Sequence, residues 1–195
     1  MKLKTPAIRL LFATPEPCPT FRADVSVLFG KYLPRLGVAS DLITELAPGV
    51  AGEVRWGGGQ AMLTSADRGS AGRHVMRLAH CGYVMFRASR ARYDAIQVRD
   101  MPLVAIVGLL AARLKGLPLF YWMSFPMPEG QIALAQGRGL SAGVLRFLFP
   151  WLRGRVGRFL LYRMVLPRAD HVFVQSERMR EDVAAKGIPM QKMTP

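Results

Sequence analysis

The chain has 195 residues, of which 51% are hydrophobic, and a net charge of +14. This is enough polypeptide for one sizeable domain with its own core, and the composition argues against intrinsic disorder. Cys18 and Cys81 are too few for a disulfide framework and form no CxxC motif, so a reduced, cytosolic setting fits best. The longest apolar run, 101–112, is too short to span a bilayer, and Arg9 interrupts the first apolar run, so neither a membrane span nor a signal peptide is expected.

Short apolar runs alternate with amphipathic segments along the chain. The apolar runs predict buried parallel strands at 8–13, 41–45, 94–100, 117–123 and 169–175. Apolar residues spaced three and four apart predict helices at 22–33, 70–90, 102–115, 140–149, 151–166 and after Ser176. Segments 47–72 and 124–130 are expected to be loops, Pro150 is expected to separate two helices, and 191–195 is expected to approach another strand. This alternation predicts an α/β fold, a Rossmann-like parallel sheet with helices on both faces.

Ligands of such open sheets bind beyond the carboxyl ends of the strands, which selects loops 14–22, 99–101, 124–130 and 175–178. Arg99 and Asp100 are adjacent at one strand end, where they form either an exposed salt bridge or a ligand contact. Loop 124–130 offers a hydroxyl and a carboxylate beside flat apolar side chains, a combination that suits sugars. Ser176 is most simply a helix N-cap, although the positive end of that helix also suits a phosphate.

Other motifs favour structural roles. The glycine triplet at 57–59 is followed by a helix only near residue 70, which favours an irregular loop over a phosphate-binding loop. His74, His80 and His171 lack metal-ligand spacing, so we expect no metal site and structural roles for all three. The chain has neither a Walker A loop nor a nucleophile elbow, and no catalytic residue is assigned.

A strongly basic region lies between Glu129 and Asp170, which contains no acidic residue. Its arginines are Arg138, Arg146, Arg153, Arg155, Arg158, Arg163 and Arg168. Aromatic residues beside arginines predict a helix on an anionic membrane surface. The predicted membrane contacts are Arg146, Trp151, Arg153, Arg155, Arg158 and Arg163. The alternative is a helix buried against the sheet or another domain, since these arginines do not share one face of a helical wheel. Nucleic acid is a less favoured partner because no nucleic-acid-binding motif is present.

Three blocks of the chain together resemble the N-terminal domain of family 4 retaining glycosyltransferases, which have the GT-B fold. They are the strand at 8–13 with its helix up to Leu36-Gly37, the segment 93–118, and the segment 169–189. The last block, ADHVFVQSE followed by KGIP, is the most specific. The family often has a Gly-Gly pair after the first strand and a histidine after the strand matching 119–123. Here those places hold PEPCP and Ser124-Phe125, which argues against donor contacts from these loops.

The resemblance implies two Rossmann-like domains facing each other across a cleft. Residues 1–195 are then expected to be the acceptor-side domain of a hexosyltransferase-like enzyme, inactive without a C-terminal domain that binds a nucleotide-sugar donor. The domain alone is expected to bind no cofactor, and transfer in the family usually needs no metal. The acceptor-binding residues are predicted to be Arg22, Arg99, Asp100, Ser124, Glu129 and Ser176. Many members dock on membranes through a basic N-terminal domain, so the expected location is cytoplasmic, at the inner face of the membrane. The rival interpretations are a peripheral membrane-binding module and a non-catalytic recruiting subunit of a split glycosyltransferase.

Overall fold

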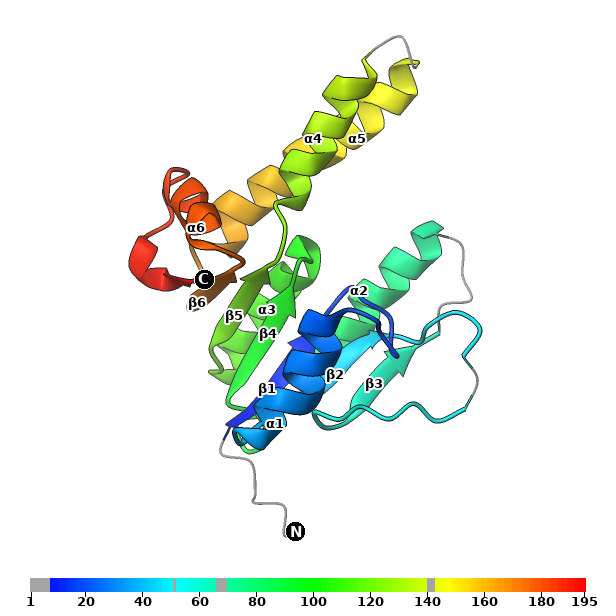
Figure 1. The fold of residues 1–195 in the computed structure, drawn as a ribbon, viewed down its shortest axis with the longest axis vertical. Helices are drawn as coiled ribbons and strands as arrows, with labels where there is room; N and C mark the ends of the chain where they lie inside the picture. The colour runs from blue at the N-terminus through cyan, green and yellow to red at the C-terminus, as the bar shows by residue number, and fades with distance from the viewer. Residues whose placement is uncertain (1–7, 51, 66–69, 140–142) are drawn as a thin grey trace. The chain divides into compact units, whose positions relative to one another are not determined.

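The computed structural model describes residues 8–50, 52–65, 70–139 and 143–195 (Figure 1). The strands are β1 (Ile8–Ala13), β2 (Val38–Glu45), β3 (Ala61–Thr64), β4 (Ala95–Arg99), β5 (Leu119–Met123), β6 (His171–Val174) and β7 (Met193–Thr194). The helices are η1 (Asp24–Tyr32), α1 (Leu33–Arg35), α2 (Ser70–Phe86), α3 (Pro102–Lys115), α4 (Met127–Arg138), α5 (Val144–Phe159), η3 (Leu160–Val165), α6 (Glu177–Ala184) and η4 (Met190–Lys192). The sheet has the strand order β3-β2-β1-β4-β5-β6-β7, which confirms the predicted α/β, Rossmann-like class. The chain divides into two compact units, Met1–Phe120 and Tyr121–Pro195.

The first unit is built around β1, which pairs in parallel with β2 on one side and with β4 on the other. One face of its sheet is covered by the π-helical segment η1, where the rings of Phe12 and Phe29 stack with centroids 4.2 Å apart. Helix α3 covers the opposite face, where Gly108 lies close to Val98 and Leu119. The first unit therefore has helices on both faces of its parallel strands, as the apolar runs predicted.

The order of strands reverses between β1 and β4. From β1 the chain proceeds outward to β2 and β3, and then returns to place β4 on the other side of β1. The loops that leave β1 and β4 diverge at this point, at the carboxyl edge of the sheet. In open α/β sheets this switch point is the usual place for a ligand.

The glycine-rich segment contains a strand that the sequence analysis missed. Residues 61–64 form β3, parallel to β2, so the expectation of an irregular loop throughout 47–72 is wrong. A Cβ atom on Gly57 would lie 2.2 Å from the carbonyl oxygen of Gly30, and Trp56 Nε1 donates a hydrogen bond to the Ser40 carbonyl at 2.7 Å. The glycines therefore let backbone segments approach closely beside β2.

Replacing Gly57 with alanine is expected to destabilise the protein by about 1–3 kcal/mol, because its methyl group meets a backbone carbonyl that cannot rotate away. Gly137 in α4 is the matched control, since a Cβ there has no neighbour within 4 Å. Gly137→Ala is expected to be neutral or stabilising by up to about 1 kcal/mol. Urea denaturation of both variants checks the pair, and equal stabilities would contradict the packing argument.

In the second unit, α4 and α5 lie side by side as a helical hairpin (Figure 1). Gly154 makes the crossing close, because a Cβ there would lie 2.7 Å from Ile132 Cγ1 and 2.9 Å from the Pro128 carbonyl oxygen. Two expectations are wrong here. Helix α4 begins at Met127, inside the predicted loop 124–130, and α5 continues through Pro150 instead of dividing there. A proline removes one backbone hydrogen bond, and the packing of α5 on α4 keeps the helix continuous despite that loss.

The end of the chain follows the prediction. Ser176 caps α6, because its hydroxyl accepts a hydrogen bond from the Met179 N–H at 3.2 Å. Gly187 adopts a φ of 92° after the helix, and β7 pairs in parallel with β6. Two histidines have structural contacts as predicted: His80 Nε2 with the Met62 carbonyl at 3.2 Å, and His171 Nε2 with the Thr194 hydroxyl at 2.9 Å. No helix in the described part of the chain is long and apolar enough to cross a membrane.

Candidate functional site

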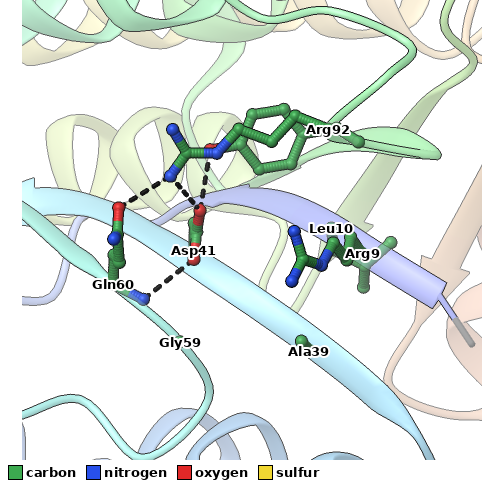
Figure 2. Close-up of a pocket in the computed structure, with 8 residues that line it drawn as sticks. Arg9, Leu10, Ala39, Asp41, Gly59, Gln60 and Arg92 are labelled. Atoms are coloured by element: carbon green, nitrogen blue, oxygen red, sulfur yellow. Dashed lines mark hydrogen bonds and ion pairs between the residues drawn. The ribbon is translucent and has the colours of Figure 1, made fainter. Parts of the chain in front are cut away.

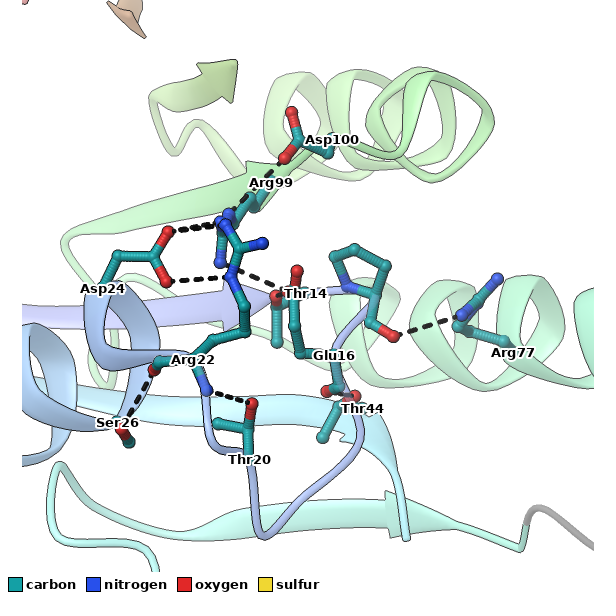
Figure 3. A network of polar contacts seen from close by, with 11 residues as sticks. Thr14, Glu16, Thr20, Arg22, Asp24, Ser26, Thr44, Arg77, Arg99 and Asp100 are labelled. Atoms are coloured by element: carbon teal, nitrogen blue, oxygen red, sulfur yellow. Dashed lines mark hydrogen bonds and ion pairs between the residues drawn. The ribbon is translucent and has the colours of Figure 1, made fainter. Parts of the chain in front are cut away.

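A buried arginine forms the centre of the polar cluster at the switch point (Figure 3). Arg99 ends β4, and its side chain is 0% exposed. Its guanidinium lies 2.5 Å from Asp24 Oδ2, 3.3 Å from Glu16 Oε2 and 3.5 Å from Asp100 Oδ2. Burying this charge is possible because three carboxylates surround it. The alternative of an exposed Arg99–Asp100 salt bridge is therefore wrong, since the pair belongs to a buried cluster.

Asp100, one of the three carboxylates around Arg99, has an unusual backbone conformation. Its φ is 49°, the left-handed region that few residues other than glycine adopt, although aspartate tolerates it better than most. The chain turns sharply at the end of β4 and keeps the Asp100 carboxylate beside the Arg99 guanidinium. Strain of this kind recurs at functional sites.

The loop after β1 is fixed against the end of β2. The Cys18 N–H donates to the Glu45 carbonyl at 2.8 Å, and the Ala47 N–H donates to the Cys18 carbonyl at 2.9 Å. The Thr44 hydroxyl donates to the Glu16 carbonyl at 2.5 Å, and the Thr14 hydroxyl donates to the Glu16 carboxylate. These contacts hold Glu16 in place beside Arg99.

Arg22 and Asp24 link the buried cluster to the surface. Arg22 Nε and Nη2 donate to Asp24 Oδ1 and Oδ2 at 3.2 and 3.0 Å, and Arg99 Nη2 donates to the same Oδ2 at 2.5 Å. Desolvation raises the pKa of Asp24, but the hydrogen bonds from Arg22 and the charge of Arg99 outweigh it, so the pKa is lowered. Asp24 is therefore ionised at neutral pH and joins two arginines, one half-exposed and one buried.

Sequence reasoning missed four charged residues at this edge, namely Glu16, Asp24, Glu45 and Arg77. Glu45 ends β2 and is only 5% exposed. Arg77 from α2 lies 3.7 Å from Glu45 Oε1, an oxygen that accepts no hydrogen bond among the described residues. Their positions in the sequence could have identified Glu16 and Glu45 as candidates. Glu16 lies in the loop after the first predicted strand, and Glu45 is the last residue of the second. Their partners are distant in sequence: Arg99 at the end of β4 pairs with Glu16, and Arg77 of α2 pairs with Glu45.

The structure brings together only some of the predicted acceptor-binding residues. Arg22, Arg99 and Asp100 share one cluster in the first unit. The other three belong to the second unit: Ser124 follows β5, Glu129 lies in the first turn of α4, and Ser176 caps α6.

Glu129 is already engaged within the second unit. Lys186 Nζ lies 2.6 Å from Glu129 Oε1 and donates to the Tyr162 hydroxyl at 2.9 Å. Burial lowers the pKa of Lys186, but hydrogen bonds to Glu129 and Tyr162 raise it by more. A ligand at Glu129 would therefore meet an ion pair and a phenol together.

A hollow of about 190 Å³ lies at the opposite, amino-terminal edge of the first unit (Figure 2). Its wall includes Asp41, whose Oδ2 accepts hydrogen bonds from the Tyr93 hydroxyl at 2.7 Å and from Arg92 at 3.0 Å. Asp41 Oδ1 accepts the Gln60 N–H at 2.8 Å. The hollow is smaller than typical ligand pockets and lies away from the carboxyl ends of the strands, where ligands bind, so we do not assign it as the ligand site. Its polar side chains instead form hydrogen bonds between the segments at this edge of the sheet.

The predicted membrane contacts lie along α5 and η3. One side of α5 packs on α4 through Gly154, and the opposite side carries a stripe of exposed apolar residues spaced three and four apart. We call this the α5 stripe: Leu145, Leu148, Phe149, Leu152, Val156 and Phe159. Arg146, Arg153, Arg155, Arg158 and Arg163 are exposed, and Trp151 is half-buried beneath the Arg155 guanidinium, which lies 5.3 Å from its ring centroid. At about 100° per residue, Arg146 and Arg153 border one side of the stripe and Arg155 borders the other.

Comparison with known proteins identifies the family. The family model described as "Glycosyl transferase 4-like domain" matches residues 27–195. The chain belongs to this glycosyltransferase family. No curated protein matches it.

Solved structures share the fold at low sequence identity. HepE from Anabaena, solved with UDP and glucose, has a TM-score of 0.51 and 16% identity, with 96% of this chain and 43% of that chain covered. UDP-GlcNAc 2-epimerase from Methanocaldococcus jannaschii has a TM-score of 0.52 and 10% identity over 96% of this chain and 45% of its own. UDP-N-acetylglucosamine 2-epimerase from Rickettsia bellii has a TM-score of 0.51 and 12% identity over 95% and 43%. The chain thus spans less than half the length of these proteins. Because this chain of a glycosyltransferase family and two epimerases share this architecture, the likeness shows the fold alone.

Proposed function

We propose that this domain binds the acceptor in a retaining glycosyltransferase that uses a nucleotide-sugar donor. Family membership supports sugar transfer as the reaction class. The observation that carries the acceptor role is the charged cluster of Arg22, Asp24 and Arg99 at the switch point, where α/β sheets bind ligands. Arg22 and Asp24 reach solvent and offer hydrogen-bond donors and acceptors to a polyol, while buried Arg99 positions them.

The remaining predicted acceptor contacts have different roles in this proposal. Asp100 pairs with Arg99, the cation that holds the carboxylates of the cluster. Ser124, Glu129 and Ser176 offer hydroxyls and a carboxylate from the second unit. The donor would be held by a further domain, and this domain contributes neither a cofactor site nor a metal site to the proposal.

A membrane-associated acceptor is the second part of the proposal. The α5 stripe exposes aliphatic and aromatic side chains on the side of α5 that faces away from α4, with arginines along its borders. This pattern is typical of a helix that lies in the headgroup layer of an anionic bilayer, with its apolar side inserted and its arginines on phosphates. A cytoplasmic enzyme docked in this way would meet lipid-linked acceptors at the inner face of the membrane.

The test is a transfer assay with the full-length protein and a panel of nucleotide sugars, with membrane lipid extract as acceptor. We expect release of a nucleoside diphosphate that depends on the extract, and a product with the anomeric configuration of the donor. Arg22→Ala should raise the KM for the acceptor about tenfold or more and leave the KM for the donor unchanged. The reason is that, of the two substrates, this proposal places only the acceptor against Arg22. Arg35→Ala, an exposed arginine in α1, is the matched control.

Three outcomes would change the proposal. Failure of every donor to react would contradict transfer, and a product of inverted configuration would contradict retention. Transfer that appears only after a separate catalytic chain is added would favour a recruiting subunit.

A further inference from the structure

The residue that precedes Arg22 of the polar cluster at the switch point carries a large, fully exposed apolar side chain. Phe21 lies in the loop between β1 and η1, and solvent reaches its whole ring. Leaving a phenyl group in water forgoes the free energy that its burial would contribute. Its immediate neighbour is Arg22, which pairs with Asp24.

The backbone on both sides of Phe21 is fixed. Before it, Cys18 makes two backbone hydrogen bonds to the end of β2, and the Thr20 hydroxyl accepts the Arg22 N–H at 3.1 Å. After it, the Arg22 carbonyl accepts the N–H groups of Val25 and Ser26 at 3.0 and 2.8 Å. The backbone that carries the ring is therefore held in place, which lowers the entropy cost of ordering this loop around a ligand.

The charges near Phe21 indicate which ligand fits. The cluster has the cations Arg22 and Arg99 and the carboxylates of Glu16, Asp24 and Asp100, which leaves one net negative charge in a chain of net charge +14. A phosphate would be repelled there. A neutral sugar ring suits both features, because its C–H face can cover an aromatic ring and its hydroxyls can donate to Asp24 and accept from Arg22.

We propose that Phe21 is a stacking platform for a neutral sugar unit of the acceptor, with the Arg22–Asp24 pair binding hydroxyls at its rim. The inference rests on the proposed function, because it names a neutral sugar ring as the part of the acceptor that contacts the carboxyl edge of the sheet. It assigns the recognition of uncharged saccharide to the loop after β1. Any phosphate of a lipid-linked acceptor would then lie away from this cluster.

The experiment uses the full-length protein and neutral methyl glycosides of common hexoses as probes, with saturation-transfer difference NMR as the readout. Glucose 1-phosphate is the anionic comparison. We expect saturation transfer to at least one neutral glycoside and weaker transfer to the phosphate. Phe21→Leu should weaken glycoside binding about tenfold, while Phe21→Trp should retain it and report it as a change in indole fluorescence. Phe125→Leu, an exposed phenylalanine in the second unit, is the matched control.

The outcomes separate this inference from the proposed function. Binding that depends on Phe21 in a protein that transfers no sugar would support the platform and contradict the transferase. Transfer with an unchanged acceptor KM in Phe21→Leu would overturn the platform and leave the transferase in place. Preferred binding of glucose 1-phosphate, or loss of vesicle binding without loss of glycoside binding in Phe21→Leu, would also overturn the platform. Equal melting temperatures of the variants exclude a folding effect.

Discussion

Replacing Arg99 with methionine is expected to destabilise the protein by about 3–5 kcal/mol, the usual cost of removing one partner from a buried charge cluster. Methionine matches much of the arginine volume, so the loss comes from charge and hydrogen bonding. Without the guanidinium, the carboxylates of Glu16, Asp24 and Asp100, which are 17%, 25% and 9% exposed, face one another with no buried cation between them. Urea denaturation of the wild type and the variant measures the difference.

The loss of stability in Arg99→Met should depend on pH, and the lowered pKa of Asp24 gives the direction of that dependence. Because the folded state lowers this pKa below its ordinary value of 3.8, the stabilisation from Asp24 is present above that value. It is lost as the pH falls through the folded-state pKa. Arg99 supplies part of the shift, so the stability gap between wild type and Arg99→Met should narrow below about pH 4.

Arg35→Met is the control for the Arg99 experiment, because Arg35 is exposed and its replacement should change stability by less than about 0.5 kcal/mol. Asp24→Asn should reproduce part of the Arg99 effect and its dependence on pH. A loss below about 1 kcal/mol in Arg99→Met, or a gap that widens in acid, would contradict the account of the cluster.

Neutralising the four arginines of α5 is expected to weaken binding to anionic vesicles by at least about tenfold. The variant replaces Arg146, Arg153, Arg155 and Arg158 with glutamine. Each basic residue near an anionic surface contributes about 1 kcal/mol, so four additive losses would approach about a thousandfold. Co-sedimentation with vesicles of phosphatidylcholine and phosphatidylglycerol in equal parts measures the change, and added salt should weaken wild-type binding.

A control of equal charge tests whether position or total charge is responsible. It replaces four exposed cations of the first unit with glutamine: Arg35, Arg87, Arg113 and Lys115. Replacing Phe149 and Leu152 with serine removes apolar surface without changing charge, and should weaken binding as well. If both charge variants lose vesicle binding equally, net charge and not the position of the α5 arginines is responsible. Unchanged vesicle binding of the serine variant would contradict insertion of the α5 stripe.

Local signals in the sequence were sufficient for most elements. The run at 8–13 became β1 with the predicted bounds, and Ser176, Gly187 and the last strand followed their capping and pairing signals. Such signals act over a few residues, so one sequence displays them fully. Strand β3 was missed because its neighbouring glycines indicate a loop, and the close approach of Gly57 to Gly30 that holds this segment is a tertiary contact. Pro150 was read as a break because the partner helix α4 was not visible in the local pattern.

The sequence by itself determined the α/β class, the carboxyl ends of most strands and the basic character of 138–168, because periodicity, strand ends and charge are properties of the chain read in order. Only the tertiary structure decided what those residues do together. The Arg99 cluster joins β4 to Glu16 and Asp24, residues more than seventy positions earlier. Its burial excludes the exposed salt bridge, one of the two interpretations that the sequence left open for Arg99 and Asp100. The same holds for α5, where packing through Gly154 set which side faces solvent and placed arginines on both borders of the apolar stripe. In both cases the deciding contacts join residues that are distant in sequence. A local sequence pattern does not reveal which distant residues will meet in the folded protein.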